Sequence, residues 1–75
     1  MGRSFSRADQ GSIREYVYQS LKSKILNLQL PPGTKISEKD ISEEYNVSRT
    51  PVREVFIKLA QEDLLDIYPQ RGSFI

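Results

Sequence analysis

The 75-residue sequence contains no cysteine and no histidine. Without cysteine, the chain cannot form a disulfide and offers no thiolate to a metal ion. Without histidine, it lacks the side chain that proteins use most often as a general base and as a metal ligand. No pairing of a nucleophile with a base replaces it. We therefore expect a domain that is not an enzyme and that holds no cofactor or metal.

Long hydrophobic runs are also missing. No apolar run approaches the roughly 18 residues of a transmembrane helix, and no apolar signal-peptide region follows the N-terminus. We therefore expect a cytoplasmic protein with no membrane partner. The net charge is only +1, but residues 48–58 hold three basic side chains and one acid, whereas residues 62–66 hold three acids and no base. Positive charge thus falls on one segment and, with Arg71, near the end of the sequence, as a DNA-facing surface requires.

The sequence VSRTPVREV combines helix-start signals with two arginines. Ser48 and Thr50 are both candidate N-caps, and Pro51, which has no N–H to donate, is tolerated in a first turn. Arg49 and Arg53 are four residues apart, so they share one face of the predicted helix. They lie at its leading end, where the helix dipole attracts anions. A recognition helix presents this end to the DNA major groove.

Hydrophobic spacing predicts three helices, near residues 12–29, 38–45 and 49–62. A capping box of Ser12 and Glu15 should open the first helix, and the Pro-Pro-Gly sequence that follows should stop it. Its inward stripe is expected to comprise Ile13, Val17, Leu21, Ile25 and Leu28, widened by Tyr16 and Leu26.

The second and third predicted helices form a helix-turn-helix. Ser37 and Asp40 should open the second helix, and Asn46, which tolerates a left-handed conformation, should form the corner after it. The inward residues of the two helices are expected to be Ile41, Tyr45, Val52, Val55, Phe56, Leu59 and Ala60.

A β-hairpin is predicted after the third helix, with strands near residues 65–68 and 73–75 and a turn at Pro69-Gln70-Arg71. Residues 34–36 are too few for more than a minor extended piece. A hairpin in this place is a wing, so the predicted fold is mainly α with a small β-hairpin, a three-helix winged helix-turn-helix. It should occupy residues 12–75, after a disordered N-terminal arm at residues 1–11.

In this order, the elements resemble the DNA-binding domain of GntR-family bacterial transcription regulators. The resemblance covers residues 13–75 and is carried by LPPGTK, SE, VSRTPVRE and PQRGSF. The TPVRE and PQRGSF sequences are most similar to the FadR-like branch, whose members carry a helical effector-binding domain after the wing. The resemblance therefore implies that this C-terminal domain is absent here. Asn46 and Asp63 stand where many members have glycine.

The resemblance also implies which residues meet DNA. Lys39 would contact DNA from the second helix, and the wing tip would lie along the minor groove. Arginine can read guanine with two parallel hydrogen bonds, whereas hydroxyls and lysine mostly hold phosphates. The implied DNA-binding residues are Lys39, Ser48, Arg49, Thr50, Arg53, Gln70, Arg71 and Gly72. Glu54 is expected to hold Arg53 in place. The carboxylates with no basic partner, which are expected to form solvated faces, are Glu43, Glu44, Glu62 and Asp63.

We therefore expect sequence-specific binding to a double-stranded DNA operator, as the operator-reading domain of a bacterial transcription regulator. The resemblance further implies a palindromic operator and a homodimer, formed when the protein is full length or bound to DNA. The main alternative is a winged-helix adaptor that binds other proteins, which would show an exposed apolar patch. An enzyme or an accessory domain of one is the third possibility, and the missing nucleophile–base pair argues against it.

Overall fold

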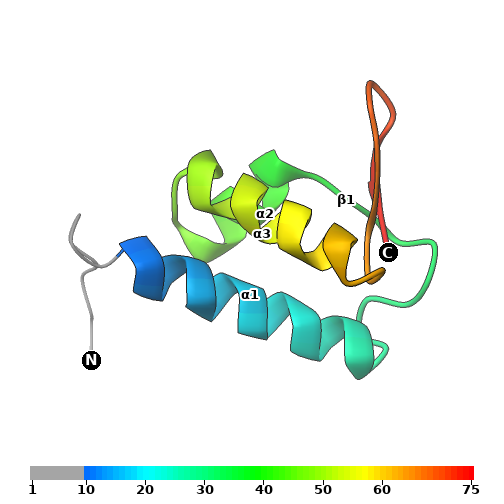
Figure 1. Cartoon of the computed structure of the whole chain (residues 1–75), viewed down its shortest axis with the longest axis horizontal. Coiled ribbons are helices and arrows are strands. Elements are labelled where there is room, and N and C mark those ends of the chain that lie inside the picture. The colour runs from blue at the N-terminus through cyan, green and yellow to red at the C-terminus, as the bar shows by residue number, and fades with distance from the viewer. Residues whose placement is uncertain (1–9) are drawn as a thin grey trace.

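A computed structural model describes residues 10–75 of the protein. Its three helices are α1 (Gln10–Leu26), α2 (Glu38–Tyr45) and α3 (Arg49–Gln61). Its three strands are β1 (Lys35–Ile36), β2 (Asp66–Tyr68) and β3 (Gly72–Phe74). Helix α1 runs beneath α2 and α3, and the β2–β3 hairpin, the wing, stands up at one end (Figure 1). The predicted three-helix winged helix-turn-helix is confirmed.

Both ends of α1 differ from the prediction. The helix already includes Gln10, so Ser12 lies inside it and cannot be its N-cap. The predicted arm is therefore wrong at residues 10 and 11, and its residues 1–9 lie outside the described residues. The helix ends at Leu26 because Leu28 adopts a left-handed conformation with φ 62°. That reversal turns the Leu28 side chain away from the inward stripe, and it is 66% exposed.

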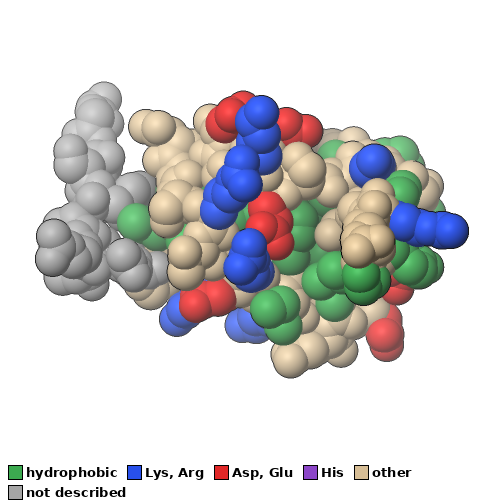
Figure 2. Space-filling view, turned by 90° about the horizontal axis from the view of Figure 1, so that it is seen from above, with side chains coloured by type: hydrophobic (Ala, Val, Ile, Leu, Met, Phe, Trp, Pro, Cys, Tyr) green, Lys and Arg blue, Asp and Glu red, His purple; other side chains and the backbone are tan. Residues whose placement is uncertain are grey.

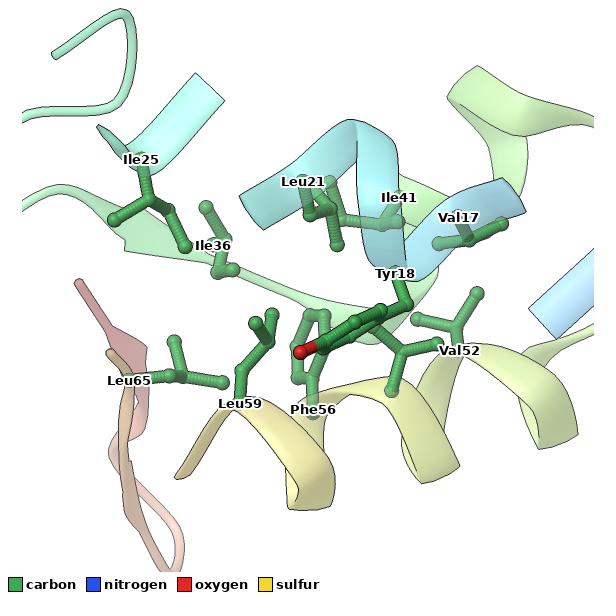
Figure 3. Packing of buried hydrophobic residues seen from close by; sticks show 11 residues of the cluster. Val17, Tyr18, Leu21, Ile25, Ile36, Ile41, Val52, Phe56, Leu59 and Leu65 are labelled. Carbon is green, nitrogen blue, oxygen red and sulfur yellow. The ribbon is translucent and has the colours of Figure 1, made fainter. Parts of the chain in front are cut away.

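The hydrophobic core lies between α1 and α3 and is closed by residues from α2 and the sheet (Figure 3). Phe56 and Leu59 of α3 face Leu21 of α1, and all three are almost completely buried. Tyr18, rather than the predicted Tyr16, is the aromatic residue of α1 in this core. The full set of buried hydrophobic residues is Val17, Tyr18, Leu21, Ile25, Ile36, Ile41, Val52, Val55, Phe56, Leu59 and Leu65.

Tyr16 and Leu26, which were predicted to widen the inward stripe of α1, are exposed instead. Helix α1 makes most of its contacts with α3, so the buried stripe follows the side that faces α3. Tyr16 lies toward α2, and its ring packs edge-on against that of Tyr45 with 6.0 Å between the centroids. Of the predicted inward residues of α3, Ala60 is only partly buried.

The helix-turn-helix forms as its local signals predict. The Ser37 hydroxyl accepts a 3.0 Å hydrogen bond from the Asp40 amide and caps α2. Asn46 adopts the left-handed conformation, with φ 57° and ψ 49°. Ser48 is the N-cap of α3 by its backbone, but its hydroxyl makes no capping hydrogen bond. Thr50 is already helical, so the prediction that it could be the N-cap is wrong.

The sheet contains one strand more than the predicted hairpin. Its order is β1-β3-β2, with both neighbouring pairs antiparallel. The short piece that includes residues 35 and 36 is therefore a paired strand, which places Ile36 opposite Ser73. Two further hydrogen bonds of 2.8 Å, from the Ile75 amide to the Thr34 carbonyl and from the Gly33 amide to the Ile75 carbonyl, continue this pairing. Pairing with β1 protects the edge of β3 and anchors the wing to the helices.

No helix within residues 10–75 is both long enough and apolar enough to cross a membrane.

Candidate nucleic-acid interface

The leading ends of α2 and α3 meet the wing around one open groove of about 420 Å³. Four of the residues that the sequence predicted to bind DNA line this groove. They are Lys39 from α2, Arg49 from α3, and Gln70 and Gly72 from the wing. Seen from above, Lys and Arg side chains cross the middle of this side of the molecule, with an acidic side chain between them (Figure 2).

The other predicted residues of α3 lie beside the groove. Ser48, Thr50 and Arg53 are all exposed at the leading end of the helix. The Ser48 hydroxyl does not cap the helix, so it remains available to an external acceptor such as a phosphate oxygen. Pro51 is buried beneath them in the first turn, which orients that turn against the core. Folding thus brings the predicted α3 residues together on one exposed helix end.

The two cations that line the groove differ from the cations of the described surface that are ion-paired, which are Arg14, Lys22, Lys24 and Arg53. Within residues 10–75, neither Lys39 nor Arg49 forms an ion pair. By contrast, Lys24 pairs with Glu44 at 3.0 Å, and Lys22 lies 3.6 Å from Glu62. Glu44 and Glu62 are exposed, as predicted for solvated faces, but the expectation that they have no basic partner is wrong. Uncompensated positive charge lies at the groove, where a polyanion could bind.

Arg53 is paired, although not with the residue that the sequence suggested. Its Nη2 atom lies 3.3 Å from a carboxylate oxygen of Glu38, the first residue of α2. Glu54, which was predicted to hold Arg53, forms an ion pair with Arg14 of α1 instead. Because adjacent helical residues point in directions about 100° apart, Glu54 is directed toward α1 and away from Arg53. Sequence reasoning missed Glu38, since its pairing depends on how α2 packs against α3.

The tip of the wing is a tight turn. The Arg71 amide donates a 3.0 Å hydrogen bond to the Tyr68 carbonyl, and Gln70 has φ 66°. With Pro69 before a residue of positive φ, this is the pattern of a type II turn. Gln70 and Arg71 are exposed, as a DNA-contacting wing tip requires. Arg71 does not line the groove.

Gly72 is required by the wing itself. Its φ is 115°, which L side chains rarely adopt, and a Cβ atom added there would lie 2.8 Å from Cε of Lys35. Lys35 is thus a basic residue beside the wing that sequence reasoning did not select. Only the pairing of β1 with β3 brings the two residues together, and a two-residue strand carries no clear sequence signal.

Exposed large hydrophobic side chains are distributed over several elements. Tyr16, Leu26 and Leu28 belong to α1 and the turn after it, and Ile57 belongs to α3. Ile67 and Tyr68 belong to the wing and line the groove. Figure 2 shows hydrophobic side chains gathered at the end of the molecule where the wing stands. The exposed apolar residues Ile67 and Tyr68 therefore lie in the same groove as polar and basic residues.

Comparison with known sequences identifies related regulators. Residues 13–75 match the sequence model of the bacterial regulatory proteins of the gntR family. The HTH-type transcriptional repressor RspR of Escherichia coli K12 is 48% identical over 63 residues, which are 84% of this chain and 28% of RspR. An uncharacterized HTH-type transcriptional regulator of Streptomyces ambofaciens is 45% identical over 62 residues, which are 83% of this chain and 26% of that protein. The chain thus spans less than a third of these relatives.

Solved structures show the same fold. A GntR-family transcriptional regulator from Pseudomonas syringae pv. tomato DC3000 aligns with a TM-score of 0.78 and 28% identity, over 84% of this chain and 27% of its own. A chain from the structure of mutant ORR3 in complex with the NTD of AraR aligns with a TM-score of 0.78 and 25% identity, over 84% of this chain and 91% of its own.

Proposed function

This chain belongs to the gntR family of bacterial regulatory proteins, and we propose that it is the operator-reading domain of a cytoplasmic transcription regulator. The winged-helix domain binds DNA. The observation that carries the proposed mode of binding is the shared groove, where Lys39 and Arg49 lie beside the wing without an ion-pair partner among residues 10–75. The related proteins, which are transcription regulators, do not favour a protein-binding adaptor.

Helix α3 would enter the major groove with its leading end. Arg49 and Arg53 occupy its first two turns on one face, and either can present two parallel N–H groups to guanine O6 and N7. Ser48 and Thr50 would donate hydrogen bonds to phosphates at the groove edge. Lys39, on the supporting helix, would contact the phosphate backbone without reading the sequence.

The wing would lie along the adjacent minor groove. Its exposed tip carries Gln70 and Arg71, and a narrow A·T-rich minor groove attracts arginine. The Lys35 side chain lies beside the Gly72 backbone, so DNA would approach Gly72 closely once that flexible side chain moves aside. Arg71→Ala is therefore expected to weaken sites with A·T-rich flanks more than the same sites with G·C-rich flanks.

The TPVRE and PQRGSF sequences support a place in the FadR-like branch of the family. In such a protein, a C-terminal effector-binding domain follows the wing, and two copies read the half-sites of a palindromic operator. Half-site centres would be separated by about 34–36 Å, one turn of DNA. Two copies of the present domain would then meet mainly on DNA. Sedimentation of the domain with and without a selected palindrome tests this expectation.

The arginines of α3 provide the test of the proposed function. We would select bound sequences from random duplexes, then compare affinities for the selected operator and a scrambled duplex. Loss of the base-reading arginine, in Arg49→Ala or Arg53→Ala, should reduce the binding free energy on the operator by about 1–3 kcal/mol and relax the sequence specificity at one base position. Arg14→Ala is the matched control, since Arg14 pairs with Glu54 on the α1 side and should leave the operator-to-scrambled ratio unchanged. An unchanged ratio in both α3 variants would refute the assignment and favour the adaptor.

A further inference from the structure

A carboxylate lies directly beside one of the two base-reading candidates. The Nε atom of Arg53 lies 3.4 Å from both carboxylate oxygens of Glu38, and Nη2 lies 3.3 Å from Oε1. The Arg53 side chain is 66% exposed, whereas that of Glu38 is only 32% exposed. Glu38 is thus the more firmly placed partner, and Arg53 projects from it toward solvent.

Glu38 has a fixed position for local reasons. It is the first residue of α2, where the helix dipole favours a carboxylate. Ser37 also stabilises the start of the helix, because its hydroxyl accepts a hydrogen bond from the Asp40 amide. Since α2 packs against α3, this carboxylate is held at a set place relative to the recognition helix.

The contact uses only part of the Arg53 guanidinium. Nε and Nη2 face Glu38, while Nη1 is directed to no acceptor within residues 10–75. A guanidinium carries five N–H groups in a rigid fork, so one edge can bind a carboxylate while others address a base. The distances to Glu38 are long for charge-assisted hydrogen bonds. The side chain is therefore oriented and can still adjust to the DNA.

We propose that Glu38 is a positioning residue that sets base specificity by orienting the Arg53 guanidinium for the major groove. This inference rests on the proposed function, in which Arg53 reads a base. Ordering a flexible arginine before binding reduces the entropy lost in the complex. At the same time, a carboxylate near the phosphate backbone repels every DNA sequence alike. Glu38 thus lowers the affinity for all DNA sequences but increases the discrimination between the operator and other sequences.

The two effects have opposite signs and can be measured separately. Affinities for the selected operator and a scrambled duplex would be measured for the wild type, Glu38→Ala, Arg53→Ala and the double variant. Glu38→Ala should bind the scrambled duplex more tightly, while its operator-to-scrambled ratio should fall roughly tenfold. In the Arg53→Ala background, removing Glu38 should cause no further fall in the ratio, because its orienting effect acts through Arg53.

Glu54→Ala is the matched control. It removes a carboxylate adjacent to Arg53 in sequence, but one that Arg14 engages, so the ratio should not change. Thermal unfolding would verify that each variant is folded. Should Glu38→Ala not fold, Glu38→Gln, which keeps the shape of the side chain, is expected to lower the ratio in the same direction and decides the question.

Three results would overturn the inference. An unchanged ratio in Glu38→Ala, with both duplexes bound more tightly by the same factor, would leave Glu38 as a repulsive charge only. An equal fall of the ratio in the Arg53→Ala background would mean that Glu38 contacts DNA itself. If Arg53→Ala alone leaves the ratio unchanged, the proposed role of Arg53 fails and that of Glu38 with it. The first two results leave the proposed function intact.

Discussion

The phenol of Tyr18 is hydrogen-bonded to the carboxylate of Glu62, with Oη 2.7 Å from Oε1 and 2.6 Å from Oε2. This contact joins the middle of α1 to the residue that follows α3. Lys22 reinforces it, since its Nζ atom lies 3.2 Å from the same phenol oxygen. The ammonium of Lys58 lies 4.2 Å from the centroid of the Tyr18 ring. The far end of α3 is thereby tied to α1, opposite the end that faces the groove.

The Glu62 contact should make stability depend on pH. The Tyr18 hydrogen bond is the largest cause, and together with the positive charge of Lys22 it outweighs desolvation and lowers the pKa of Glu62 below its ordinary value of 4.5. A lowered pKa in the folded state contributes stability above the unfolded pKa and loses it as the pH falls through the folded pKa. The free energy of unfolding should therefore decrease as the pH falls below about 4.5.

Urea unfolding between about pH 6 and pH 3 measures this dependence. Glu62→Gln should show a shallower decrease than the wild type, and Tyr18→Phe should reduce the slope in the same direction while keeping the buried ring. Equal slopes in all three proteins would contradict the assignment.

Leu21 and Leu28 were both expected on the inward stripe of α1, but only Leu21 is buried, at 0% exposed. Leu21→Ala should destabilise the domain by about 2–5 kcal/mol through lost burial and a residual cavity. Leu28→Ala should change stability by no more than about 0.5 kcal/mol, as for other surface positions. Chemical denaturation of the two variants compares them directly. A large loss in Leu28→Ala would show that this side chain is covered in solution.

Gly72→Ala should destabilise the domain by about 1–3 kcal/mol, because the alanine must hold a positive φ. The double variant Gly72→Ala with Lys35→Ala separates the two causes, since it removes the close contact with Lys35 but keeps the backbone strain. Because the Lys35 Cε atom is at the far end of a flexible side chain that can move aside, we expect the double variant to recover little of the loss. Gly11→Ala is the control and should stabilise the domain instead, because Gly11 is helical with open space around its Cα. Full recovery in the double variant would assign the cost to the contact alone.

Lys39→Ala should weaken binding to operator and scrambled DNA about equally. Loss of one phosphate contact should also reduce the dependence of log K on log salt by about 0.9 units. Lys24→Ala is the matched control, since Lys24 is paired with Glu44 and does not line the groove. DNA-binding titrations at several salt concentrations measure the dependence of log K on log salt for both variants. A selective loss on the operator would instead place Lys39 at a base edge.

Several parts of the fold follow from signals within a few residues. Ser37, Asn46 and Pro51 take the cap, the corner and the first-turn position that their own chemistry favours. The spacing of Val52, Phe56 and Leu59 marks the buried face of α3, because helical periodicity repeats every 3.6 residues. The same local reasoning placed the start of α1 wrongly at Ser12, since a capping box is a weak signal when the helix can extend further. It also could not foresee the left-handed turn at Leu28.

The basic and polar residues that gather at the groove were identifiable from the sequence, because the elements that carry them could be recognised. Their partners were not. The pairing of Arg53 with Glu38, the approach of the Lys35 side chain to Gly72 and the pairing of β1 with β3 all join residues far apart in the chain. Such contacts depend on how α2 packs against α3 and on which strand β3 pairs with. The sequence alone therefore determined the order of elements and the basic helix end, whereas the tertiary structure decided which charges within residues 10–75 are ion-paired and which are not.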